Sequence, residues 1–441
     1  MSEPTAPSEP EAVRATEAAD AVAAAESAES AEAADAGKVA ALRAVLPATR
    51  AGIYLNTGTS GPLPAETAAA MREIEDRELA LGRGTMAAYE ELKARMDEAR
   101  AAMAAVLGTE IDAVALTHST TEGMNLAIGT VDWQPGDRVL TTNLEHPGVT
   151  APLAAIHDRH GVEVVVADIG DGGDADATLA TLEHELRAGG VKMVALSHIA
   201  WSTGAVLPVA RIAELGHEHG ALVAIDGAQG AGAVPVDFDA LGADFYAASG
   251  QKWLLGPEGT GALAVALAAR ELIPLTRGYF SFGTPHGVGR EFLWPNARRF
   301  ESGGIHKPSV AGLARSVGWL AMFVDLEWAM ARAARLARSA ADRLAATPGV
   351  ELVTPRASMG TLVTFRVAGW TAEAVMEELS KRIFAIVRTL PGWDAVRLSV
   401  GFFTTEAELR RVLDTVELIA SHTPETLPVR PATEFAYSAG L

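Results

Sequence analysis

Short apolar runs alternate with longer amphipathic stretches through the middle of the chain. The apolar runs occupy residues 113–118, 138–142, 162–169, 191–199, 221–226, 243–248 and 261–267. Stretches with helical spacing lie between several of them, at 122–130, 148–160, 178–188 and 208–219. Apolar runs of this length, bounded by turn residues, are typical of strands buried on both faces, and their alternation with helices predicts βαβ units. The pattern therefore predicts an α/β fold with a seven-stranded, mostly parallel sheet that helices cover on both sides.

The chain on either side of this region has a different pattern. Residues 65–107 have apolar side chains at helical spacing and predict two helices. From Ala311 to about Ala346 the spacing predicts one long helix, and short strand-like runs follow it. These runs lie at 350–354, 361–367, 384–388 and 396–402. We therefore expect a large domain at 41–310, which includes an N-terminal arm, and a smaller C-terminal α+β domain at 311–441.

Two local patterns concern the ends of the chain. Thr405 and Glu408 have the spacing of a capping box, which predicts the start of the last helix. Residues 1–40 contain nine acidic and two basic residues and no aromatic residue, and they consist mostly of Ala, Glu, Ser and Pro. Such a segment lacks the apolar surface whose burial would offset the entropy of ordering it. We therefore expect a disordered, acidic, Ala-rich tail at 1–40.

The composition narrows the class of function. The formal charge is −20 and the chain contains no cysteine. A strongly acidic chain lacks the basic face that a phosphate backbone requires, so we expect no nucleic-acid partner. The missing thiols exclude disulfides, thiolate metal sites and a cysteine nucleophile within these 441 residues. The acidic loop at 168–176 lacks the glutamate that closes an EF-hand, and we expect no metal site.

The location of the protein is inferred from what its sequence contains. The N-terminus has neither the basic nor the apolar part of a secretory signal. The longest uncharged stretch, Met193–Ala210, contains His, Ser, Thr, Gly and Pro and is a poor membrane span. We therefore expect a cytoplasmic protein without a membrane partner.

One acid and one lysine lie at the ends of two apolar runs. Asp226 ends the run at 221–226, and Lys252 follows the run at 243–248 in a turn of small residues. Burial among such residues favours the neutral amine of a lysine, which can form a Schiff base with a carbonyl. A buried carboxylate can hold a proton on a heterocyclic nitrogen. Pyridoxal phosphate (PLP) requires both groups. The spacing alone fits equally well an Asp226 that only ends a strand and a Lys252 in a solvated loop.

The sequences around these two residues resemble a known family. They read D-G-A-Q at 226–229 and S-G-Q-K-W-L-L-G-P at 249–257. They are similar to the cofactor-lysine region of fold-type I PLP enzymes of the class V aminotransferase group, which includes cysteine desulfurases, selenocysteine lyases and isopenicillin N epimerase-like proteins. The resemblance implies that Lys252 carries the internal aldimine, that Asp226 meets the pyridine nitrogen, and that Gln229 reaches the ring hydroxyl. It also implies phosphate contacts from Ser249 and Gln251, although members often have His in place of Gln251.

Two further segments match this family at the cofactor. On its own, THSTTEGMN at 117–125 is typical of an ordinary helix N-cap, and His146 in NLEHPG is a loop histidine. The first segment is similar to the phosphate-binding motif of the family, which implies that Thr120 and Thr121 bind the phosphate. Ser119 stands where many members have glycine. The second match implies that the ring of His146 stacks on the cofactor.

Two segments resemble family elements that complete the active site. SHIAWSTG at 197–204 has Trp201 where desulfurases have asparagine, and it is closer to the lyase-like and epimerase-like branch. The resemblance implies that His198 and Trp201 line the substrate side. RRFESGGIHKP resembles the segment that crosses to the neighbouring subunit, which implies a phosphate contact from Ser302 and Gly303. It also implies a homodimer with shared active sites.

Candidate substrate contacts come from both ends of the folded chain. VRLSVGFFTTE resembles the segment whose arginine binds the substrate α-carboxylate through a bidentate fork, and this residue is Arg397. Without the other motifs, Arg397 would be read as a strand arginine paired with a surface acid. Arg388 is a second candidate anion contact. Asn56 lies in a turn-rich loop of the type that touches substrate in the family.

The resemblance implies a PLP enzyme that acts on an amino acid through an external aldimine and abstraction of the α-proton, with Lys252 as the base. Class V aminotransferase-like activity and β-elimination by a C–S or C–Se lyase remain open together, and epimerisation is a third outcome. The usual desulfurase step is disfavoured because no cysteine can accept sulfur. A non-catalytic PLP fold and a nucleotide-binding protein with its loop at 227–232 are the remaining alternatives, and that loop lacks the spacing of known nucleotide motifs.

Overall fold

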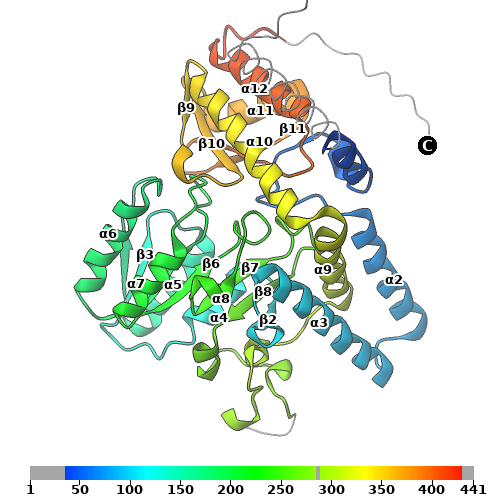
Figure 1. The fold of residues 1–441 in the computed structure, drawn as a ribbon, viewed down its shortest axis with the longest axis vertical. Helices are drawn as coiled ribbons and strands as arrows, with labels where there is room; N and C mark the ends of the chain where they lie inside the picture. Colours follow the sequence, from blue (N-terminus) through cyan, green and yellow to red (C-terminus); the bar gives the residue numbers. More distant parts are fainter. Residues whose placement is uncertain (1–34, 285–288, 430–441) are drawn as a thin grey trace, which may run out of the picture.

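The predicted seven-stranded sheet forms the centre of the larger domain. The computed structural model describes residues 35–284 and 289–429 (Figure 1). The strands are β2 (Val114–Thr117), β3 (Arg138–Thr142), β4 (Glu163–Ala167), β5 (Val191–Ser197), β6 (Leu222–Asp226), β7 (Phe245–Ser249) and β8 (Gly261–Val265). Their order is β2-β8-β7-β6-β5-β3-β4, and β8 runs antiparallel to both of its neighbours, whereas the other neighbouring pairs are parallel. The prediction of a mostly parallel sheet is confirmed.

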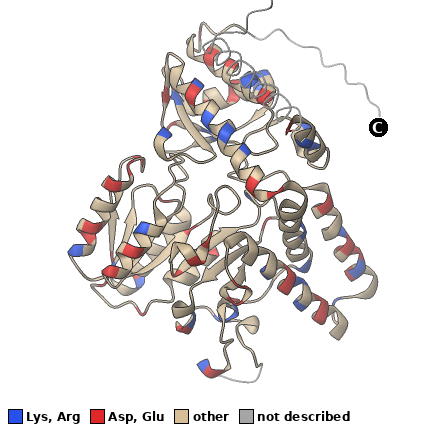
Figure 2. Cartoon of the chain, viewed as in Figure 1, with Lys and Arg blue, Asp and Glu red and all other residues tan. Residues whose placement is uncertain are grey.

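Apart from its edge strand β4, which is partly exposed, the sheet is largely buried on both faces, because alternate residues of the strands enter different hydrophobic clusters. In β7, Phe245 and Ala247 pack with α4 (Thr120–Ile128) and α5 (Pro147–His160). Tyr246 and Ala248 point the other way and join the cluster that includes α3, α6 and α7. These helices cover Met86–Leu107, Ala175–Arg187 and Val209–Glu218. In Figure 2, acidic and basic residues lie mainly on the outer helices, and the apolar strands lie between these helices.

The helix predicted from 311 to 346 is two helices. α9 (Lys307–Trp319) packs against α2 (Ala65–Leu81) and α3, and α10 (Leu326–Ala346) continues at an angle of 81° after a π-helical turn at Leu320–Val324. Asp325 lies at the bend with φ +67°, and its side chain accepts hydrogen bonds from the amides of Glu327 and Trp328. This N-cap starts a new helix, so the expectation of one continuous helix was wrong.

Within the described residues, no single helix is long and apolar enough to span a membrane. The bent pair formed by α9 with its π-helical turn and α10 is long and apolar enough only when its two helices are counted together.

The smaller domain is an antiparallel sheet backed by helices. Its strands are β9 (Val350–Leu352), β10 (Leu362–Val367), β12 (Arg388–Leu390) and β13 (Ala395–Ser399), in the order β12-β13-β10-β9. Its helices include α11 (Ala372–Ile383) and α12 (Glu406–Ala420). The predicted capping box is present, since the Thr405 side chain accepts from the Glu408 amide and the Glu408 carboxylate accepts from the Thr405 amide. The expected domain boundary at 310 remains a prediction.

The apolar run predicted as one strand at 384–388 divides between two sheets. β11 (Ala385–Ile386) pairs in parallel with β1 (Ile53–Tyr54), and β12 joins the antiparallel sheet. The N-terminal arm therefore adds to the edge of the small domain, and a bridge between Asn56 and Ser399 extends the contact. Sequence distance concealed this pairing, because more than 300 residues separate the two strands.

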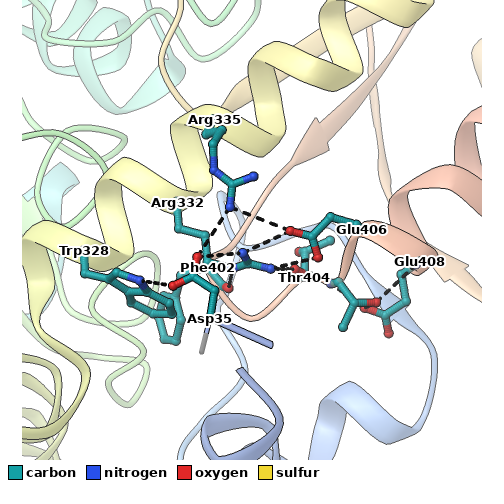
Figure 3. A network of polar contacts seen from close by, with 9 residues as sticks. Asp35, Trp328, Arg332, Arg335, Phe402, Thr404, Glu406 and Glu408 are labelled. Atoms are coloured by element: carbon teal, nitrogen blue, oxygen red, sulfur yellow. Dashed lines mark hydrogen bonds and ion pairs between the residues drawn. The ribbon is translucent and has the colours of Figure 1, made fainter. Parts of the chain in front are cut away.

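The start of the described chain is tied to the small domain by a buried arginine. Arg332 on α10 donates Nε to the carbonyl of Phe402 and pairs with Asp35 and Glu406 (Figure 3). Residues 35–44 are helical, so the six residues 35–40 of the predicted tail are ordered by this contact. Residues 1–34 of that predicted tail lie outside the described residues.

This network predicts unequal effects for two arginines that contact the same carboxylates. Arg332→Ala should lower the free energy of unfolding by about 3 kcal/mol, because its side chain is only 3% exposed and its removal leaves the buried carbonyls of Phe402 and Thr404 without their donor and a packed site empty. Arg335→Ala is the matched control and should cost less than about 1 kcal/mol, since that side chain is 58% exposed. Urea denaturation measures both, and equal losses would contradict the assignment.

Candidate active site

A cavity opens at the carboxyl ends of the parallel strands, between the sheet and the small domain. Its volume is about 280 Å³. It is lined by Gly58, Thr59, Ser119, Thr120, Thr121, His146, Trp201, Asp226, Ala228, Gln229, Ser249, Gln251, Lys252, Arg388 and Arg397. Four surface grooves, of about 770, 600, 530 and 380 Å³, are larger, but none of them is lined by a lysine among the described residues. Most of the residues predicted for the site therefore converge on the smaller cavity.

Asp226 and Lys252 form the charged centre of the cavity. Asp226 is the last residue of β6, and its Oδ1 accepts a hydrogen bond of 2.9 Å from the amide of Ala228. Burial raises the pKa of Asp226, and the nearby ammonium of Lys252 opposes that rise. Burial also lowers the pKa of Lys252 to about 8, although the Asp226 carboxylate favours the charged amine. A fraction of Lys252 is therefore neutral near neutral pH.

Small residues allow the turn after β7 to present Lys252. The amide of Gly250 donates to the carbonyl of Thr260, and a Cβ at Gly250 would lie 2.2 Å from the Thr260 hydroxyl oxygen. Leu255 adopts φ +54° and its amide donates to the carbonyl of Lys252. The N-terminal arm packs on the same turn, since a Cβ at Gly61 would lie 2.4 Å from that carbonyl oxygen. The backbone of Lys252 is thus fixed from two directions.

One end of the cavity presents neutral hydrogen-bond donors. The amide of Thr120, at the first turn of α4, donates to Oγ of Ser249, and the two hydroxyl oxygens are 2.6 Å apart. Ser119 is the N-cap, and its Oγ accepts from the amide of Glu122. Oε1 of Gln251 is buried without a hydrogen-bond partner among the described residues. A helix N-terminus with hydroxyls, beside a glutamine amide that can turn its Nε2 donor toward the cavity, is suited to an anion such as phosphate.

His146 lies beside this centre as a neutral ring. Its Nδ1 accepts a hydrogen bond from the amide of Gly148, so Nε2 carries the proton. Burial, assisted by the three cations of the cavity, lowers the pKa of His146 to about 4. A Cβ at Gly148 would lie 3.0 Å from Oγ1 of Thr121 and 3.7 Å from Oδ2 of Asp226. The absence of a side chain there leaves the ring, the hydroxyl and the carboxylate around one open space.

Gln229 joins the large domain to the N-terminal arm. Its Nε2 donates to the carbonyl of Gly58 at 2.8 Å, and its Oε1 accepts from Nε1 of Trp253. A Cβ at Gly58 would lie 2.9 Å from Oε1 of Gln229 and 3.2 Å from Nη2 of Arg397. Gly58 therefore permits the close approach of the glutamine and the arginine.

Two arginines from the small domain also line the cavity. Arg397 on β13 is 2% exposed, and its Nη1 donates to the carbonyl of Trp201 at 2.8 Å. Its Nε has no hydrogen-bond partner among the residues described. Burial, and then the charge of Arg388, lowers the pKa of Arg397 to about 9. Arg388 on β12 donates to Oγ1 of Thr59 at 3.3 Å.

Four predicted site residues do not line this cavity. His198 is buried with its Nδ1 2.9 Å from the hydroxyl of Tyr246, and this contact directs its ring into the protein and away from the substrate side on which it was expected. Asn56 acts through a neighbour, because its Oδ1 accepts from Thr59, which in turn contacts Arg388. Ser302 and Gly303 lie outside the cavity of their own chain, and their expected contact with a second subunit remains a prediction.

The sequence analysis missed residues that support the site from behind. Glu145 is buried, and its two carboxylate oxygens accept from the hydroxyls of Thr142 and Ser197 at 2.7 and 2.6 Å. Burial raises the pKa of Glu145 to about 7, against the effect of these hydrogen bonds. In the sequence, the position of Glu145 next to His146 at the end of a strand was the only indication of this role. Thr59 carried no signal beyond its turn-rich loop.

The cavity fits the cofactor that the resemblance implies. Phosphate oxygens would be held by the donors at Thr120, Ser249 and Gln251, where one buried oxygen of the Gln251 amide is unsatisfied and the amide group can turn its donor to the cavity. Asp226 would hold the pyridine nitrogen, and Lys252 would hold the aldehyde carbon. The open space beside Gly148 would accommodate the ring next to His146.

Comparison with known proteins finds similar sequences in one family. The family model described as aminotransferase class-V matches residues 53–412. A probable cysteine desulfurase of Mycolicibacterium paratuberculosis is 32% identical over 74% of this chain, and the match spans only 49% of that longer protein. Isopenicillin N epimerase of Streptomyces clavuligerus is 28% identical over 83% of this chain and 94% of its own length.

A solved structure resembles the whole fold. The cystine C–S lyase C-DES, in complex with its reaction product cysteine persulfide, has a TM-score of 0.79 and 27% identity over 84% of this chain and 99% of its own. Another structure of that lyase contains glycine covalently linked to its PLP cofactor.

The coupling of Asp226 and Lys252 can be measured without the cofactor. In the cofactor-free protein, the rate at which an acylating reagent labels Lys252 should rise with pH with a midpoint of about 8. Asp226→Asn should move this midpoint lower, because loss of the carboxylate removes the charge that favours the ammonium form. Peptide mass spectrometry follows the labelling, and the exposed Lys93 reports on the reagent. An unchanged or higher midpoint would show that the two groups are not coupled.

Proposed function

Because this chain belongs to the aminotransferase class-V family and is a PLP-dependent enzyme, we propose that it is a C–S lyase for a cysteine-derived amino acid. The observation that carries the proposal is a cavity that combines Asp226, Lys252 and Arg397 in a chain without cysteine. Its relatives include desulfurases and a cystine C–S lyase, and a sulfur atom cannot be transferred to a thiol that the chain lacks. The sulfur atom is therefore released in a free thiol or persulfide product and is not passed to a cysteine of the enzyme.

Arg397 would fix the substrate by its α-carboxylate. Its Nη1 is held by the Trp201 carbonyl, and its unpartnered Nε and its Nη2 are available for a planar, two-point contact. Burial strengthens that contact because little water competes for the guanidinium. The small domain thereby orients the amino acid toward Lys252 on the large domain.

Lys252 would move the proton. When bound, PLP supplies an electron sink that stabilises negative charge on the α-carbon. Nζ of Lys252, with its lowered pKa, takes the α-proton and then donates it to the departing sulfur. Asp226 would keep a proton on the pyridine nitrogen through its buried carboxylate, and the neutral ring of His146 would exclude water from the cavity. The net reaction is RSCH₂CH(NH₃⁺)COO⁻ + H₂O → RSH + CH₃COCOO⁻ + NH₄⁺.

Ser302 and Gly303 belong to the same proposal. We propose that the enzyme is a homodimer in which these two residues contact the phosphate in the neighbouring subunit. Their position outside their own chain's cavity supports this arrangement. Lys252, in contrast, serves the cavity of its own subunit.

The reaction is tested by its products. Purified holoenzyme given cystine or an S-alkyl cysteine should release pyruvate and ammonia in equal amounts with a thiol or persulfide, without any amino acceptor. Lys252→Ala should lower the rate by at least about 1,000-fold, because it removes the only lysine among the described residues that line the cavity.

Other outcomes would replace the proposal. Keto acid without ammonia, formed only with an amino acceptor, would show transamination. Loss of optical activity without cleavage would show epimerisation, the reaction named for one relative. Lys192→Ala is the matched lysine control, since that residue is on β5 and does not line the cavity.

A further inference from the structure

The residue that follows the cavity lysine forms a buried polar contact. Trp253 stands next to Lys252 in the turn after β7, and it is 5% exposed. It does not line the cavity, and its ring packs in a small apolar cluster with Ile199, Ala233 and Leu362. Its Nε1 donates a hydrogen bond of 2.9 Å to Oε1 of Gln229, which does line the cavity. Trp253 can therefore reach a ligand only through Gln229.

This hydrogen bond fixes which way the amide of Gln229 faces. An indole N–H can only donate, so the amide oxygen must face Trp253. The amide nitrogen lies on the other branch and donates to the carbonyl of Gly58 at 2.8 Å. That nitrogen carries two N–H groups, and the bond to Gly58 is the only one that Nε2 makes within the described residues. Its second N–H is therefore available to an acceptor in the cavity.

The two partners of Gln229 belong to different parts of the structure. Gly58 follows the N-terminal arm, whose strand β1 pairs with β11 beside the small domain. Trp253 belongs to the same turn as Lys252, so its bond fixes the amide relative to the lysine. Gly232 restrains Trp253 in turn, because it adopts φ +83° and a Cβ there would lie 3.2 Å from Cβ of Trp253. Trp253 is thus a rigid support for the amide.

PLP carries an acceptor that suits this donor. Its ring hydroxyl is on the carbon next to the one that bears the aldehyde, and its phosphate is attached on the other side of that carbon. Lys252 would hold the aldehyde carbon, so the hydroxyl would lie beside Lys252 and away from the phosphate contacts described above. Gln229 forms its hydrogen bonds with Gly58 and Trp253 and with none of those phosphate contacts in the described part of the chain.

We propose that Trp253 is a positioning residue, which holds the amide of Gln229 so that Nε2 donates to the ring hydroxyl oxygen of PLP. The contact of Gln229 with that hydroxyl is the expectation from the sequence, and its dependence on Trp253 is the new element. An amide that is already oriented loses less entropy when the ligand binds. The consequence is selectivity for a pyridine ring with a hydroxyl next to the carbon at Lys252. This inference rests on the binding of PLP and not on the lyase reaction proposed above.

The inference is tested with two ligands that differ only at the ring hydroxyl. Pyridoxine 5′-phosphate and 3-deoxypyridoxine 5′-phosphate both lack the aldehyde and cannot react with Lys252. Calorimetry of the full-length, cofactor-free wild type should show about fivefold tighter binding of the first ligand. Trp253→Phe keeps an aromatic ring but frees the amide to turn, so the ratio should fall to about twofold or less. Gln229→Met should abolish the preference.

A second tryptophan provides the matched control. Nε1 of Trp370 also donates at 2.9 Å, to the carbonyl of His422, and Trp370 does not line the cavity. Trp370→Phe should leave the ratio of the two affinities unchanged. Equal weakening of both ligands in Trp253→Phe would overturn the inference, since packing and not the hydroxyl contact would then depend on Trp253. Equal affinities of the two ligands in the wild type would also overturn it.

The wild type decides if Trp253→Phe does not fold, which its melting temperature reveals. In protein labelled with nitrogen-15 at tryptophan, the indole N–H signal of Trp253 is identified by its shift in Gln229→Met. This signal should move more with pyridoxine 5′-phosphate than with the deoxy ligand, and equal movement would overturn the inference. If the ratios hold but no thioether is cleaved, only the lyase proposal fails. A wild type that binds neither ligand would overturn the PLP site and this inference with it.

Discussion

The site depends on two opposite charges buried at one edge of a sheet. Asp226 is the last residue of β6, and Lys252 follows β7. Because these strands are parallel neighbours, the carboxylate and the amine reach the same cavity although the two residues are not adjacent in sequence. Burial disfavours the charged form of each group, and their attraction offsets part of that cost. The residual effect is an amine that exchanges protons near neutral pH. The glycines and the left-handed Leu255 matter because they hold the backbone of Lys252 where this balance applies.

The two domains contribute different chemistry to one cavity. The sheet provides the acid, the lysine and the helix N-terminus at Thr120, whereas the small domain provides Arg388 and Arg397. α10 connects them, since Ala329 packs in the core of the large domain and Leu336 in that of the small domain. A ligand that contacts both Lys252 and Arg397 must therefore link two separate hydrophobic cores, and its affinity depends on how the two domains are placed relative to each other.

The sequence predicted what local patterns determine. Each of the seven apolar runs overlaps a strand, because strands covered by helices on both faces require apolar residues at most positions, and the edge strand β4 is partly exposed. The resemblance added residues that the structure gathers around Lys252. Long-range contacts were not predictable in this way: the strand pairing of β11 with β1, the cap at Asp325, and the bond that directs His198 to Tyr246 depend on partners far away in sequence or on one side chain in a rare conformation.

The pairing of β1 with β11 has a consequence for how the protein is made. The amide of Leu55 donates to the carbonyl of Ile386, and the amide of Ser399 donates to the carbonyl of Leu55. The arm can pair with these partners only after more than 300 further residues have been translated. Gly58 and Thr59, which follow the arm, can take up their places in the cavity only then. The nascent chain therefore carries an unpaired strand edge until β11 and β13 have left the exit tunnel.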